Sequence, residues 1–117
     1  MKGRDFIQLH EFFDRLHGIV EGFVDTLAER ITALGGVADG RIQTTVSASQ
    51  LYTYSIETSS GEQHLKALAA VLAQFGKSVR MDIDAATAGG DADTADVFTE
   101  ISRETDKQLW FVEAHLG

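Results

Sequence analysis

Apolar side chains recur at alternating steps of three and four residues along the first third of the chain. They are Phe6, Leu9, Phe13, Leu16, Val20, Phe23, Leu27, Ile31 and Leu34. This spacing places one apolar stripe along a helix of about 3.6 residues per turn, and Gly35 and Gly36 form a natural C-terminal stop. The pattern predicts one long helix of about eight turns over 6–34.

Two further stripes of the same period follow later in the chain. The first comprises Leu65, Leu68, Leu72, Phe75, Val79, Ile83 and Ala86, and the second comprises Ala95, Phe98, Ile101, Leu109, Val112 and Leu116. Ser60 is a suitable N-cap for the first of these helices, and Gly89 and Gly90 are its stop. Asp93 is expected to cap the second, which should run to His115.

The segment between the first two long helices, 37–60, is rich in Gly, Ser and Thr and has irregular apolar spacing. It is too long for a tight turn, so we expect a crossover that holds a short helix near Ser47 to Tyr52. Three long helices with one long crossover predict an all-α fold. The arrangement corresponds to a ferritin-like four-helix bundle in which the N-terminal helix is missing, and 1–117 should form a single domain.

The amino-acid composition limits the kinds of metal site and of binding partner that this chain can have. No cysteine is present, which excludes disulfides and thiolate metal sites and leaves imidazole and carboxylate as the strong metal ligands. The formal net charge of −8 disfavours nucleic acid, and the Lys and Arg residues are scattered along the chain. There is no apolar signal segment and no apolar run long enough to span a bilayer, so we expect a cytoplasmic protein without a membrane partner.

Two pairs of potential metal ligands lie on the first predicted helix. His10 and Asp14 are spaced i, i+4, and so are Asp25 and Glu29. Each pair therefore projects from one helix face, close enough to share an ion. The pairs begin 15 residues apart (10 to 25), or roughly 22 Å at ~1.5 Å per residue, so they cannot meet within one helix.

A second copy of the same helix can bring the two pairs together. If two antiparallel copies cross midway, at Ile19 and Val20, the first pair of one copy faces the second pair of the other. Gly18 and Gly22 bracket that midpoint and allow close approach of the backbones. The alternative is that the four residues only form a solvated polar face, in which case the chain is a noncatalytic helical oligomerisation module.

These residues carry a family resemblance. The segment GRDFIQLHEFFDRLHGIVEGFVDTLAERI, together with GGVADGRIQT and DADTADVFTEISRETDKQLWFVEAHL, resembles the Dps proteins, the ferritin-like DNA-protecting proteins of starved bacteria. The resemblance implies that His10 and Asp14 of one subunit bind iron with Asp25 and Glu29 of its two-fold mate. It further implies a hollow homododecamer that oxidises Fe(II), preferably with hydrogen peroxide, and stores the ferric product as a mineral.

The resemblance also implies a preceding helix that ends in a His-Trp-Asn motif and supplies another histidine ligand. The sequence starts at Met1, where that motif should have finished. We therefore expect a fragment or a misassigned start; the alternative is an inactive truncated subunit. Without this ligand, iron binding should be weaker and oxidation slower.

Other acidic residues and one tryptophan suggest secondary roles. The resemblance places Asp93, Asp96 and Asp106 near a three-fold axis, where an acidic pore would concentrate Fe(II). Glu11 and Glu21 are candidates for mineral nucleation, although exposed glutamates usually serve solubility. Trp110 is expected to pack in the core near the iron site. His17 is not expected to replace the missing imidazole, and direct DNA binding is not expected because no lysine-bearing tail is visible.

Overall fold

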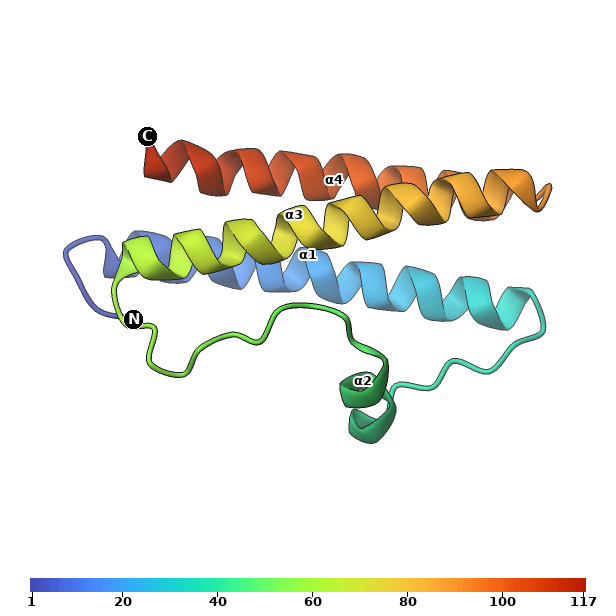
Figure 1. The fold of residues 1–117 in the computed structure, drawn as a ribbon, viewed down its shortest axis with the longest axis horizontal. Coiled ribbons are helices and arrows are strands. Elements are labelled where there is room, and N and C mark those ends of the chain that lie inside the picture. Colours follow the sequence, from blue (N-terminus) through green and yellow to red (C-terminus); the bar gives the residue numbers. More distant parts are fainter.

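A computed structural model describes residues 1–117 as four helices without a β-sheet. The helices are α1 (Phe6–Ala33), α2 (Ile42–Ala48), α3 (Gly61–Ala88) and α4 (Ala92–Leu116). The three long helices lie side by side along the longest dimension of the molecule, 49 Å, while the crossover with α2 runs along one side (Figure 1). The all-α prediction and the three long helices are confirmed. None of the helices combines the length and apolarity needed to cross a bilayer.

Helices α3 and α4 form an antiparallel hairpin. Ser60 caps α3 as predicted: its side chain accepts from Gln63 N, and the Gln63 side chain returns to the Ser60 backbone, completing a capping box. The helix ends at Gly89, and Gly90 then adopts φ of 76°, a left-handed conformation that glycine reaches without steric cost. Asp91 follows and begins α4.

The cap of α4 differs from the prediction. Asp91, and not Asp93, is the N-cap, because its side chain accepts a hydrogen bond from Thr94 N at 3.0 Å. Asp93 lies in the first turn of the helix, where the helix dipole stabilises its negative charge. The reason is the tight turn after Gly90, which starts the helix two residues earlier than the periodicity indicates.

The buried core is small and joins all three long helices. It comprises Leu9, Phe12, Leu16, Leu65, Leu72 and Val112. Helix α3 packs along the length of α4, whereas α1 contacts α4 at fewer positions. Consequently much of the predicted apolar stripe of α1 is exposed in the single subunit, including Val20, Ile31 and Leu34 at 40%, 42% and 58%.

An apolar groove of about 420 Å³ separates α1 from α3. Its walls are formed by Phe13, Leu16, His17 and Val20 of α1, by Leu68, Val71, Leu72 and Phe75 of α3, and by Leu51 and Tyr54 of the crossover. The groove leaves Phe13 and Val20 of the α1 stripe partly accessible, although α1 and α3 pack together elsewhere in the buried core.

The crossover is attached to the bundle by side-chain hydrogen bonds. Its short helix α2 spans 42–48, earlier than the predicted helix near Ser47 to Tyr52, because residues 50–54 are extended along α3. There Gln74 accepts from Tyr52 N at 2.9 Å and donates to Gln50 O at 2.5 Å. The side-chain amide of Gln74 on α3 therefore uses both its oxygen and its nitrogen to hold the backbone of the crossover.

Candidate functional site

Helix α1 brings the first predicted pair together on its outer face. Nε2 of His10 lies 3.6 Å from Oδ2 of Asp14, and their side chains are 55% and 71% exposed. The i, i+4 spacing produces this contact, since the two residues follow one another on the same face. An imidazole and a carboxylate thus converge at the surface with most of their ligand atoms open to solvent.

The ring of Phe6 orients His10. Their centroids are 5.5 Å apart and the two planes differ by only 6°, so the rings stack. Stacking on the preceding turn restricts the rotation of the imidazole and directs it along the helix surface. Phe6 is a positioning residue that the sequence analysis assigned only to the apolar stripe, although its i, i+4 spacing from His10 would have been enough to find it.

The second predicted pair is also exposed, but further along α1. Asp25 and Glu29 both lie at the surface, and neither joins the first pair within one subunit. No group of three or more His, Asp or Glu side chains converges anywhere in the single chain. One subunit therefore presents two separate pairs of candidate ligands on α1, called half-sites below, and no group of three convergent ligands.

The surface between the two half-sites is open. A Cβ added at Gly18 or at Gly22 meets no atom within 4 Å. The two glycines line a shallow concavity of about 510 Å³ together with Glu21, Val24 and Asp25. Ile7 and Val24, on the same helix, are 62% and 63% exposed.

The three residues predicted to line a pore are not gathered within the subunit. Asp93 and Asp96 are exposed near the start of α4, and Asp106 lies about ten residues further, or ~15 Å along the helix. Asp106 Oδ1 accepts from Nη1 of Arg80 at 3.3 Å. Asp106 therefore has a basic partner at the surface, whereas Asp93 and Asp96 form no ion pair.

The remaining sequence candidates on α1 are surface residues. Glu11 is exposed without a hydrogen bond from its side chain. Nδ1 of His17 lies 4.0 Å from Oε2 of Glu21, so these two residues form another histidine and carboxylate pair at i, i+4 spacing. His17 follows His10 by seven residues, about two helical turns, so it lies on nearly the same face of α1 and also borders the apolar groove.

The prediction for Trp110 was wrong. Its side chain is 63% exposed, whereas Val112 two residues later is fully buried. Two residues on a helix span about 200°, so these side chains point to opposite faces of α4. Trp110 instead contacts the ring of Phe111, with centroids 4.9 Å apart.

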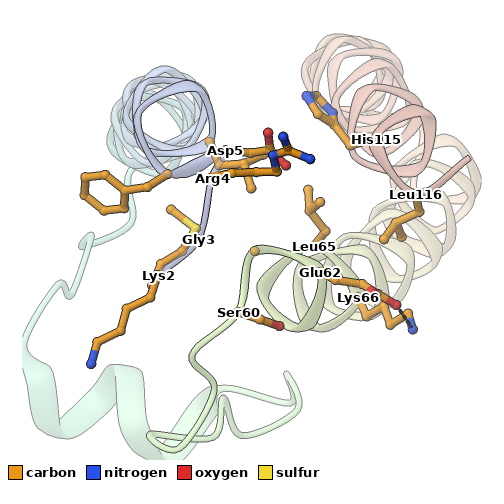
Figure 2. Close-up of a pocket in the computed structure, with 14 residues that line it drawn as sticks. Lys2, Gly3, Arg4, Asp5, Ser60, Glu62, Leu65, Lys66, His115 and Leu116 are labelled. Atoms are coloured by element: carbon orange, nitrogen blue, oxygen red, sulfur yellow. Dashed lines mark hydrogen bonds and ion pairs between the residues drawn. The ribbon is translucent and has the colours of Figure 1, made fainter.

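The sequence analysis missed a pocket of about 540 Å³ at one end of the bundle. Figure 2 shows the N-terminal segment, the start of α3 and the end of α4 around it, with Arg4 and Asp5 between the helices. Lys66 donates to Glu62 at 2.5 Å on its rim. The lining holds three cationic side chains, Lys2, Arg4 and Lys66, and two carboxylates, Asp5 and Glu62, so it carries a small excess of positive charge.

Comparison with known proteins decides the family. The sequence model of the ferritin-like domain matches residues 1–117. The DNA protection during starvation protein of Agrobacterium fabrum is 39% identical over 116 residues, which are 99% of this chain and 72% of that protein. This chain belongs to the Dps family of ferritin-like proteins.

Further Dps relatives agree in sequence and structure. General stress protein 20U of Bacillus subtilis is 31% identical over 100% of this chain and 80% of that protein. The crystal structure of Dps from Staphylococcus aureus superposes with a TM-score of 0.93 at 29% identity, covering 99% of this chain and 77% of that chain. The resemblance in the sequence is thereby confirmed, and the ferritin-like fold with it.

Proposed function

We propose that this Dps chain is the ferroxidase subunit of a homo-oligomer that binds Fe(II), oxidises it and sequesters the ferric product. The observation that carries the proposal is the arrangement of two exposed half-sites on α1, His10 with Asp14 and Asp25 with Glu29, on either side of the open glycines. Residues 1–117 act as one domain in this proposal, and the bacterial cytoplasm is the compartment. The names of the relatives, which refer to starvation and stress, support a protective role.

The two-fold arrangement completes the site. When α1 of a second subunit crosses antiparallel at Gly18 and Gly22, His10 and Asp14 of one subunit face Asp25 and Glu29 of the other. An isologous interface of this kind repeats the site twice in each dimer. The open glycine surface and the exposed Ile7 and Val24 support such a contact, since association would cover them.

The ligand chemistry suits iron as a substrate. Carboxylates stabilise the harder ferric product, a neutral imidazole binds Fe(II), and few ligands for each ion leave room for hydrogen peroxide as the oxidant. Phe6 holds the imidazole in place for this task. Accumulated ferric ion would then be deposited inside a dodecameric shell, with Glu11 and Glu21 as nucleating carboxylates and Asp93 and Asp96 attracting Fe(II) at the entry.

The proposal is tested by adding Fe(II) anaerobically to the full chain, followed by stoichiometric hydrogen peroxide, and recording ferric absorbance. We expect the double variant His10→Ala with Asp14→Ala to suppress protein-dependent oxidation. The matched control is His17→Ala, which removes another exposed histidine of the same helix and leaves Glu21 in place. Equal rates in the parent and the first double variant reject the assignment.

A noncatalytic helical oligomerisation module is the second candidate, because the exposed apolar residues of α1 favour association whether or not iron binds. Measurement of mass in solution with and without Fe(II) separates the two. A dodecamer that takes up iron supports the ferroxidase, and a dimer or trimer indifferent to iron supports the module. Direct DNA binding is not part of either proposal, given the net charge of −8.

A further inference from the structure

Tyr54 of the crossover and His64 in the first turn of α3 form a close pair. The Tyr54 hydroxyl oxygen lies 2.5 Å from Nδ1 of His64, and the two rings stack with centroids 5.7 Å apart. The same hydroxyl is 3.5 Å from the His64 carbonyl oxygen, a much weaker interaction. The short contact of the Tyr54 hydroxyl is therefore with Nδ1 of His64 and not with the His64 carbonyl.

One tautomer of His64 makes Nδ1 an acceptor for the Tyr54 hydroxyl. In that tautomer the ring proton is on Nε2, which is buried without a hydrogen-bond partner. Burial raises the pKa of Tyr54, so the phenol keeps its proton at neutral pH. The short contact then aligns the phenolic O–H with Nδ1 of His64.

We propose that Tyr54 is a one-electron redox site and that Nδ1 of His64 accepts its phenolic proton. When an oxidant removes one electron from Tyr54, the O–H bond breaks, the proton moves to His64, and a neutral tyrosyl radical remains beside an imidazolium. On reduction an electron returns to the oxygen and the proton moves back. A positioned base favours this step because the oxidised phenol is a far stronger acid than the phenol itself.

The location of the pair connects it with iron oxidation, and this part of the inference rests on the proposed function. The ring of His64 is 6.4 Å from that of Phe13 on α1, the helix that carries the first half-site on its outer face. Hydrogen peroxide needs two electrons to form two waters, and one Fe(II) supplies only one. Tyr54 supplies the other: Fe(II), peroxide, the Tyr54 phenol, the His64 imidazole and two protons give Fe(III), the tyrosyl radical, the His64 imidazolium and two waters.

The chain contains a matched control for this site. It has two tyrosines, and Tyr52 lies two residues before Tyr54 in the same crossover. The Tyr52 side chain is 63% exposed and its hydroxyl makes no hydrogen bond to the protein, whereas Tyr54 is 44% exposed and paired. Both phenols are thus reachable by an added oxidant, and only one has a base.

The first experiment uses hexachloroiridate(IV), an outer-sphere one-electron oxidant, so it does not depend on iron binding. In a Trp110→Phe background, which removes the single indole, we expect a tyrosyl radical by electron paramagnetic resonance that persists in Tyr52→Phe and disappears in Tyr54→Phe. His64→Gln retains a hydrogen-bond acceptor but cannot take the proton, and should slow oxidation of Tyr54 about 100-fold.

A radical that survives Tyr54→Phe, or an unchanged rate in His64→Gln, overturns the proposal. Circular dichroism of each variant verifies folding, and the comparison of the two tyrosine variants remains decisive even if His64→Gln does not fold.

A second experiment adds one Fe(II) for each half-site pair with peroxide and traps hydroxyl radical. We expect more trapped radical in Tyr54→Phe than in Tyr52→Phe, and equal amounts would overturn the link to iron. If the parent does not oxidise iron, the proposed function fails while the first experiment still decides the redox site.

Discussion

Arg30, near the end of α1, contacts Asp91, the residue that caps α4, with Nη2 3.0 Å from the carboxylate Oδ1. Nε of the same guanidinium donates to the Thr94 hydroxyl at 2.9 Å. The Asp91 side chain in turn accepts from Thr94 N. One carboxylate therefore closes the first turn of α4 and attaches it to α1, at the end of the bundle where α1 has few other contacts.

This relationship predicts a pH dependence of stability. Hydrogen bonds from the Thr94 hydroxyl and backbone, more than the charge of Arg30, hold the pKa of Asp91 below its usual range. Because the folded pKa is depressed, the contribution of Asp91 is present above its unfolded pKa of about 3.9 and is lost as pH falls through the lower folded value. Asp91→Asn should reduce the slope of unfolding free energy against pH below about pH 4.

The control for that prediction separates the two causes. Arg30→Met removes the guanidinium but leaves the Thr94 hydrogen bonds, so most of the pH dependence should remain. Urea unfolding followed by circular dichroism between acidic and neutral pH measures both variants. Loss of the slope in Arg30→Met as well as in Asp91→Asn would show that the ion pair and not the cap is the cause.

The capping box predicts that Ser60→Ala destabilises the fold. The variant removes the hydrogen bond to Gln63 N and should lower the free energy of unfolding by about 1 kcal/mol. Ser59→Ala is the matched control, because Ser59 uses only its backbone groups at this helix start. Equal urea midpoints for the two variants would contradict the assignment of the cap.

Val112 provides a test of the small core. It is fully buried, and Val112→Ala removes two methyl groups at the junction of the three long helices, which should cost about 2 kcal/mol of unfolding free energy. Val37→Ala makes the same chemical change at a side chain that is 90% exposed and should have little effect. A small effect at Val112 would mean that α1, α3 and α4 do not pack as described.

The open glycines of α1 give opposite predictions for the subunit and for the assembly. Gly22→Leu meets no neighbour in the single chain and improves helix propensity, so the isolated subunit should be unchanged or about 0.5 to 1 kcal/mol more stable. In the proposed two-fold contact the new side chain blocks backbone approach and dissociates the dimer. Analytical ultracentrifugation measures this, with Ala73→Leu on the exposed surface of α3 as control. An unchanged oligomer in Gly22→Leu argues against the crossing point.

The elements most accessible to sequence reasoning were those specified by local patterns. The three long helices, the Ser60 cap and the stop at Gly89 follow from residue spacing and capping chemistry that act within a few turns. The pairing of His10 with Asp14 has the same origin, because i, i+4 residues on a helix are neighbours wherever that helix packs. The assembly of both half-sites into one iron centre stays a prediction, since it depends on a second subunit.

The sequence by itself therefore determined which segments are helical, which family the chain belongs to and which side chains share a face of α1. Only the tertiary structure decided that Asp91 and not Asp93 caps α4 and that Trp110 points outward. It also decided that Tyr54 of the crossover contacts His64 of α3. The physical reason is range: helical periodicity and capping are local properties of the chain. The burial of a side chain, or a hydrogen bond between residues ten positions apart, depends instead on how the helices and the crossover are placed against one another.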